Sequence, residues 1–156
     1  MGTAKRERHD LSNLLSRQGH RLLQVGVALL LFTSLEGFAI PYSTAPGAGR
    51  SVHSLSGLTA VLLLAFGLVW PQLDLALMAA RIAFWFLLYS ALAIVVAFLL
   101  AAVWGAGNAT MPLAGPGRGN AFRETVIMIV AYSSAPTGLI AFALILWGLR
   151  TTPERS

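Results

Sequence analysis

Four long apolar stretches alternate with short polar segments along this chain, and almost every ionisable residue lies outside them. The stretches cover about residues 22–40, 54–70, 82–104 and 125–149. A run of about 18 or more apolar residues is long enough to cross the roughly 30 Å hydrocarbon layer of a bilayer as a helix. The pattern therefore predicts an all-α fold, with residues 1–156 forming a single four-span domain built as an integral membrane four-helix bundle.

The composition supports a membrane protein over a soluble one. Charged residues make up 11% of the chain, against about 25% in a typical soluble domain. The net charge of +5 lies beside the apolar stretches rather than in a basic patch, which argues against nucleic acid as a partner. The chain has no cysteine, so disulfides, thiolate-bound haem and cysteine-ligated iron–sulfur clusters are excluded.

The distribution of Lys and Arg predicts the orientation in the membrane. Four spans return the C-terminus to the side of the N-terminus, and eight of the eleven cationic residues fall on that side. They are Lys5, Arg6, Arg8, Arg17, Arg21, Arg81, Arg150 and Arg155. The opposite side holds only Arg50, Arg118 and Arg123. Because cytoplasmic loops are enriched in Lys and Arg, we expect both termini to be cytoplasmic.

Three ionisable residues occur at the outer ends of the apolar stretches. Glu36 lies about one turn inside the first stretch, His53 lies at the start of the second, and Glu124 opens the fourth. Antiparallel helices bring all three to one end of the bundle. An ionisable group at membrane depth is costly and is therefore a candidate functional residue. Tyr42 and Asn120 lie in loops that cap the same end and are weaker candidates.

Each of these residues also has a structural interpretation. Glu124 follows Arg123 in the first turn of its helix, where an acid favours the helix dipole. Glu36 could form a structural pair with Arg50 or Arg123, or it could orient a partner or move a proton in a catalytic site. His53 could cap a helix or bond a loop carbonyl instead of binding a ligand.

A stripe of small residues runs from His53 through Gly57, Ala60 and Gly67 at roughly helical spacing. Small residues at this spacing let helix backbones approach closely in lipid, so helix–helix packing is the expected role. A flat macrocycle also needs a wall without large side chains. Gly57, one turn from His53, would provide such a wall.

Four segments resemble the hydroxylaminobenzene mutases: residues 18–24, 36–41, 51–56 and 131–138. The likeness extends from about residue 18 to residue 150. Members of that family are small four-span bacterial membrane proteins of nitroarene degradation, and they isomerise an aryl hydroxylamine to an aminophenol. The resemblance implies an isomerase of the bacterial inner membrane that acts on a small aromatic substrate.

The chain also resembles, more distantly, the styrene oxide isomerases. Those proteins have four spans, a Gly-Phe segment that ends the first span and a His-Ser pair that enters the second. Their histidine binds haem b at a subunit interface within a trimer, and the ferric iron acts as a Lewis acid. The resemblance implies haem b as cofactor, His53 as the iron ligand and a homo-oligomer. Thr59 stands near the position of an asparagine in that family, so epoxide isomerisation is kept as the alternative activity.

The candidate site therefore has two parts. Glu36, Tyr42, Asn120 and Glu124 are the candidate catalytic residues. His53 and Gly57 are the candidate cofactor-binding residues, with His53 as the metal ligand. Without haem, the chemistry would fall to acid–base transfer between His53 and Glu36. From a different functional class, a non-catalytic membrane accessory protein would also fit the apolar composition.

Overall fold

The computed structural model describes residues 2–42 and 44–150. In this part of the chain every regular element is helical, which confirms the all-α prediction. The long helices are α1 (Gly2–Glu36), α2 (Pro46–Val69), α3 (Leu77–Trp104) and α4 (Ala121–Gly148). Three short 3₁₀ helices lie between them: η1 (Ile40–Tyr42), η2 (Trp70–Gln72) and η3 (Pro112–Ala114).

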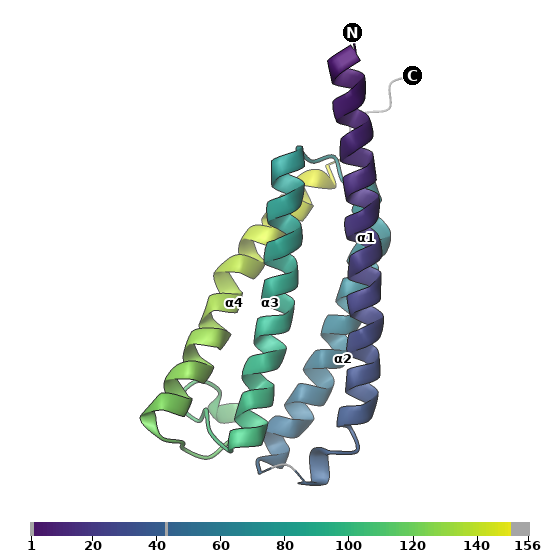
Figure 1. Ribbon diagram of the computed structural model, residues 1–156. Coiled ribbons are helices and arrows are strands. Elements are labelled where there is room, and N and C mark those ends of the chain that lie inside the picture. The colour runs from purple at the N-terminus through teal and green to yellow at the C-terminus, as the bar shows by residue number, and fades with distance from the viewer. Residues whose placement is uncertain (1, 43, 151–156) are drawn as a thin grey trace.

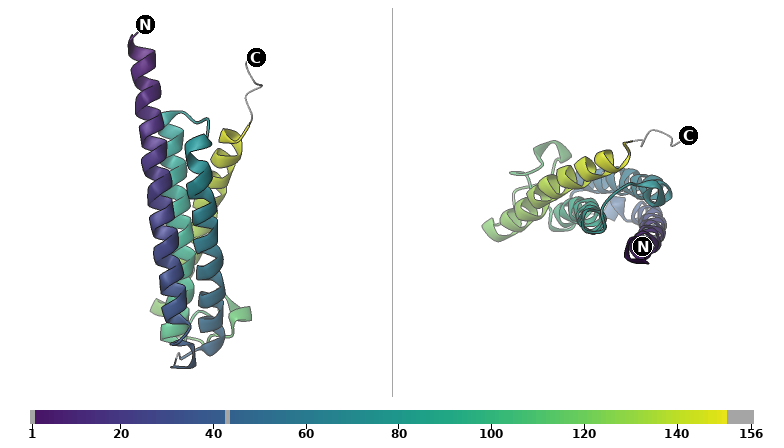
Figure 2. Two further views of the ribbon diagram at one scale, coloured as in Figure 1. Left: turned by 90° about the vertical axis from the view of Figure 1, so that its right-hand side faces the viewer. Right: turned by 90° about the horizontal axis from the view of Figure 1, so that it is seen from above.

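The four helices form two antiparallel pairs. α1 packs along α2 and α3 packs along α4, and the two pairs meet through α2 and α3. Seen from above, α1 and α4 lie on opposite sides of the bundle (Figure 2). Both ends of the described chain lie at the same end of the bundle, and α1 extends beyond the other helices there (Figure 1). Two chain ends on the same side of the bundle agree with a chain that crosses the membrane an even number of times.

Three helical segments are long and apolar enough to cross a membrane: Pro46–Gln72, Leu77–Trp104 and Ala121–Gly148. α1 is not among these three. Its N-terminal half is polar, and the helix ends at Glu36 rather than at residue 40, because the chain turns at residues 37–39. Crossing by α1 therefore stays a prediction, while the other three apolar stretches form helices of membrane-spanning length.

The start of α2 differs from the sequence prediction. α2 begins at Pro46, where proline suits the first helical position because it has no N–H to satisfy. The outer connection is shorter than the polar sequence suggested, and His53 lies two turns inside the helix. His53 therefore does not cap α2, which corrects one of its structural interpretations.

Small residues bring α1 and α2 into close contact. A Cβ atom added at Gly19 would lie 2.8 Å from the carbonyl oxygen of Gly67, and one added at Gly67 would lie 3.0 Å from that of Gly19. The packing role expected for the stripe that includes Gly67 is thus confirmed. Beside this contact, the buried Trp70 donates a hydrogen bond from Nε1 to Oε1 of Gln18 at 3.0 Å.

Hydroxyl groups join α3 to α4 near the middle of the bundle. Ser90 Oγ donates to the backbone oxygen of Ser134 at 2.8 Å, and the hydroxyls of Tyr89 and Ser133 lie 2.7 Å apart. Pro136 interrupts the backbone hydrogen bonds of α4 at this level, because proline has no N–H. Interhelical hydrogen bonds of this kind satisfy polar groups that lipid cannot.

Candidate active site

A histidine–carboxylate pair occupies the end of the bundle opposite the termini. Nδ1 of His53 lies 3.3 Å from Oε2 of Glu36, and this is the only contact within 4 Å between an acidic and a basic side chain in residues 9–42 and 44–150. The Glu36 side chain is 10% exposed and that of His53 is 46% exposed. The pair therefore combines a nearly buried carboxylate with an imidazole that reaches the surface.

The turn after α1 positions this pair. Glu36 is the last residue of α1, and Gly37 follows it beside the imidazole. A Cβ atom at Gly37 would lie 3.1 Å from Cε1 of His53 and 3.3 Å from Nδ1. The ring therefore packs directly against the backbone at Gly37, and a side chain at that position would push the ring away.

Buried hydroxyls one turn deeper anchor the backbone of His53. The hydroxyl oxygens of Thr33 on α1 and Ser56 on α2 lie 2.8 Å apart, and both residues are buried. Ser56 Oγ also donates to the backbone oxygen of His53 at 3.2 Å. Thr33 precedes Glu36 by three residues and Ser56 follows His53 by three, so each hydroxyl shares a helix face with its charged neighbour.

The position of Glu36 explains why it needs this partner. A carboxylate at the C-terminus of a helix faces the negative end of the helix dipole, and a nearby proton donor offsets that repulsion. With the proton on Nδ1 and directed at the carboxylate, Nε2 of His53 carries a lone pair. Nε2 has no hydrogen-bond partner within residues 2–42 and 44–150. It is therefore free to bind a metal or accept a proton.

Gly57 lies one turn further along α2 from His53. A Cβ atom there would meet only Cγ2 of Thr33, at an ordinary contact distance of 3.6 Å. Close helix packing therefore does not require glycine at position 57, in contrast to position 67. A side chain at position 57 would therefore fit beside Thr33, one turn along α2 from His53.

Glu124 and Asn120 form a separate cluster on α4. The Glu124 carboxylate accepts hydrogen bonds from the backbone N–H groups of Gly107 at 2.9 Å, Gly119 at 2.8 Å and Ala109 at 3.3 Å. Asn120 caps α4, because its Oδ1 accepts from the backbone N–H of Arg123 at 2.9 Å. Both residues hold the α3–α4 connection in place, and the structural interpretation of Glu124 is correct in outline.

The structure does not bring the α4 cluster to the His53–Glu36 pair. The two groups share one end of the bundle, as antiparallel packing predicted, but α1 and α4 lie on opposite sides of it (Figures 1 and 2). The expected pairing of Glu36 with Arg50 or Arg123 is not formed. Arg123 instead lies over the Trp104 ring, at 5.8 Å from its centroid. Catalytic roles for Asn120 and Glu124 remain predictions.

Tyr42 lies in η1 at the same end, with 88% of its surface exposed. No side-chain hydrogen bond ties it to the pair in the part of the chain that the structure describes.

Sequence reasoning missed Thr33, Gly37 and Ser56, which position the pair. Their signal was present, because each lies within one turn of Glu36 or His53.

A cavity of about 400 Å³ lies between α2, α3 and the segment around η3. Ser51, Phe98 and Thr110 contribute to its lining, together with Met111 and neighbouring residues of η3. Thr110 Oγ1 is buried and has no hydrogen-bond partner among the described residues. The cavity is within the size range of small-molecule sites, which start at about 300 Å³.

Comparison with known proteins identifies relatives. Residues 18–150 match the family described as styrene oxide isomerase. Hydroxylaminobenzene mutase HabB of Ectopseudomonas oleovorans is 44% identical over 136 residues, covering 86% of this chain and 83% of that protein. Hydroxylaminobenzene mutase HabA of the same organism is 34% identical over 130 residues, covering 82% and 96%. No solved structure matches significantly.

The family match spans the histidine–carboxylate pair, and the similarity to the two mutases confirms the first resemblance inferred from the sequence. The chain belongs to the styrene oxide isomerase family, together with the two hydroxylaminobenzene mutases, and is a membrane isomerase.

Proposed function

We propose that this isomerase converts hydroxylaminobenzene and similar aryl hydroxylamines to aminophenols at the end of the bundle that carries His53 and Glu36. Similarity to the two mutases supports the substrate class. In this reaction the N–O bond breaks and a C–O bond forms at a ring carbon. That carbon loses a proton and the nitrogen gains one. The reaction is redox-neutral, so the site has to manage one oxygen and two proton transfers.

We further propose that His53 binds haem b through Nε2, and the residues present fit such a group. Nδ1 faces a carboxylate, which is the usual second partner of a metal-ligating histidine. The imidazole is half-exposed, and Gly57 leaves the adjacent surface free of a side chain. Residues 9–42 and 44–150 contain no group of three metal-binding side chains. Haem needs only one axial imidazole, because the macrocycle supplies the other nitrogens.

When bound, the ferric iron supplies a Lewis acid for the oxygen of the substrate. His53 holds the cofactor, and Glu36 acts as a positioning residue by fixing the tautomer and the ring orientation. Gly37 and the Thr33–Ser56 hydroxyls hold the imidazole ring in its position beside the end of α1.

The surroundings suit an apolar aromatic substrate. Leu35 and Phe38 flank the turn that carries Glu36, with 71% and 80% of their surfaces exposed. Apolar side chains beside the site favour entry from the lipid rather than from water.

We propose a bacterial inner membrane location with both termini cytoplasmic, on the eight-to-three division of positive charge. A reporter fused after residue 156 that proved to be periplasmic would contradict this orientation.

A homo-oligomer is part of the proposal. The bundle leaves the His53 imidazole at its surface, where a neighbouring subunit could complete the site. The trimer of the styrene oxide isomerases, with haem between subunits, is the arrangement we expect. Mass measurement of the detergent-solubilised protein tests it, and a monomer that retains full activity would contradict it.

A second candidate activity is isomerisation of an aryl epoxide, because the matching family is described by styrene oxide. Membranes containing the protein, incubated separately with hydroxylaminobenzene and styrene oxide, distinguish the candidates. Aminophenol formed without added reductant supports the proposal, and a carbonyl isomer of the epoxide supports the second candidate. No turnover of either compound would contradict both and favour a non-catalytic accessory role.

A further inference from the structure

Three arginines converge at the end of the bundle that carries the termini. Arg17 and Arg21 on α1 and Arg81 on α3 line one cleft of about 230 Å³. All three are exposed, and no carboxylate of the described residues lies within 4 Å of them, Asp10 and Asp74 included. Like charges at this spacing repel one another, so an anion in the cleft would relieve the repulsion.

The floor of this cleft is preformed. Gln18 is 5% exposed and is held by the hydrogen bond from Trp70. Phe84 is 2% exposed and makes edge-on contacts with Trp70 and Trp85, at centroid distances of 6.1 Å and 5.3 Å. The arginines therefore project from a rigid aromatic base at the expected depth of a membrane–water interface.

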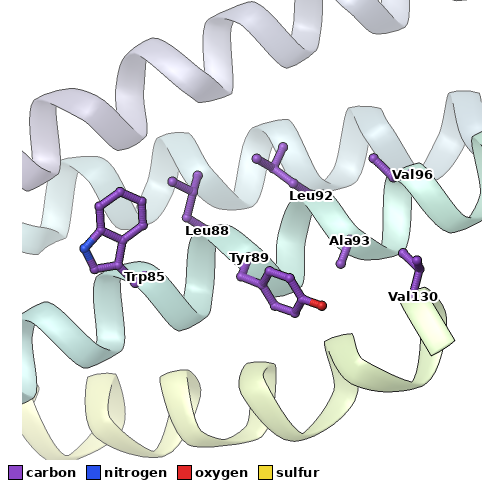
Figure 3. A pocket seen from close by; sticks show the side chains of 7 residues that line it. All are labelled: Trp85, Leu88, Tyr89, Leu92, Ala93, Val96 and Val130. Atoms are coloured by element: carbon purple, nitrogen blue, oxygen red, sulfur yellow. The ribbon is translucent and has the colours of Figure 1, made fainter.

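An apolar groove continues from this cleft along α3. Trp85 lines both, and the groove of about 410 Å³ runs past Leu88 and Leu92 to Val96, with Val130 of α4 at its far end (Figure 3). Residues 81, 85, 88, 92 and 96 share one face of α3, because they are three or four positions apart. The cationic cleft and the apolar groove thus meet at Trp85 on one face of α3.

The length of the groove matches one leaflet. Val96 follows Trp85 by eleven positions on α3, which is about 16 Å at a rise of 1.5 Å per residue. Half of the hydrocarbon layer is about 15 Å. A cationic cleft joined to an apolar groove of this length is complementary in shape and charge to an anionic phospholipid rather than to a free anion.

We propose that this surface binds one anionic phospholipid, with its phosphate among Arg17, Arg21 and Arg81 and one acyl chain along α3 from Trp85 to Val96. Basic pockets between membrane helices are known to bind anionic lipid head groups. The site lies at the opposite end of the bundle from His53, so it is independent of the proposed catalytic function. It would anchor α1, the least apolar of the four helices, to α3 at the membrane surface.

The test uses the full-length protein in an uncharged detergent. Phosphatidylglycerol, phosphatidylcholine with the same acyl chains, and inorganic phosphate are added separately. Binding is measured by native mass spectrometry for the lipids and by the shift of the thermal unfolding midpoint for all three. We expect phosphatidylglycerol to be retained and to raise the midpoint by several degrees, while phosphatidylcholine and inorganic phosphate leave it unchanged.

Neutralised arginines locate the site. Arg81→Gln should weaken phosphatidylglycerol binding about fivefold, and replacing all three arginines should weaken it on the order of a hundredfold. Arg150→Gln is the matched control at the same end, since Arg150 instead lies 4.4 Å from the centroid of the Trp147 ring. Leu92→Trp, which fills the groove from an exposed position, should also lower retention.

Three results would overturn the proposal. Equal retention of phosphatidylcholine and phosphatidylglycerol would show that the arginines do not select the head group. An equal loss of binding in Arg81→Gln and Arg150→Gln would show non-specific attraction. A midpoint raised as far by inorganic phosphate as by phosphatidylglycerol would make the cleft a site for free anions.

Discussion

Replacement of Glu36 by Gln separates the role of the carboxylate in the site from its role in stability. Glutamine keeps an oxygen that can accept the Nδ1–H of His53 but removes the negative charge. The Glu36 side chain is only 10% exposed, but the imidazole is 46% exposed and the Nδ1···Oε2 distance is 3.3 Å, so solvent reaches the histidine side of the pair. Because the glutamine oxygen can keep the hydrogen bond, we expect a loss of about 1 kcal/mol in the free energy of unfolding, the upper end for exposed pairs. We therefore expect Glu36→Gln to fold with nearly the wild-type yield.

The expected loss of activity is much larger than this change in stability. Changes to the hydrogen-bond partner of a metal-ligating histidine typically cost about 10–100-fold in metal affinity or activity. We expect Glu36→Gln to lower the initial rate of aminophenol formation about tenfold, and Glu36→Ala, which removes the acceptor, to lower it further. The assay compares rates per folded molecule with unfolding midpoints.

The control for this comparison is Asp74→Asn, which makes the same acid-to-amide change at an exposed position at the far end of the bundle. Its rate should equal that of the wild type. Full activity in Glu36→Gln would refute the assignment of Glu36 as a positioning residue. A fall in rate that simply follows a fall in folded yield would assign it to stability alone.

Three further predictions concern packing around the site and the outer connection. Gly37→Ala should lower activity at least several-fold with little loss of folded protein, because the new methyl group would lie 3.1 Å from Cε1 of His53; unchanged kinetics would show that the ring position is not critical. Glu124→Ala should lower the free energy of unfolding by about 1–3 kcal/mol in chemical denaturation, since three backbone N–H groups lose their acceptor; activity per folded molecule then tests its predicted catalytic role. Thr110→Val should raise stability by about 1 kcal/mol, because it removes a buried hydroxyl without a partner, and a loss of stability would show that the hydroxyl is in use.

The sequence predicted the helices well but not their ends. The length of an apolar run identifies a membrane-spanning helix, because the thickness of the hydrocarbon layer sets how many residues one crossing needs. The first turns of α2 were missed because residues 46–52 are rich in Gly and Pro and resemble a loop. Tertiary packing stabilises the helix in this segment, because Ala48 and Val52 are fully buried and Gly47 packs against the backbone oxygen of Ala114. The contact of Gly47 with Ala114 joins positions 67 residues apart and leaves no local signal.

The sequence likewise predicted which end of the bundle carries the site, but not which of its residues are in contact. Antiparallel topology alone placed Glu36, His53 and Glu124 at one end of the bundle. Which of them meet depends on how each helix is rotated about its axis and on the packing order of the helices. Glu36 therefore met His53 rather than an arginine, and Glu124 met backbone N–H groups of a loop.

The absorption spectrum of the purified protein, recorded together with the rate of aminophenol formation, tests the central claim most directly. The wild-type protein should show a Soret band. His53→Ala should lose the band and the activity together, because Nε2 of His53 is the proposed iron ligand. His20→Ala should keep both, since His20 is exposed and follows Gly19, which packs against Gly67 near the end of α2 that is far from His53. A colourless wild-type protein that still isomerises the substrate would contradict the haem assignment, and an active His53→Ala would contradict the site itself.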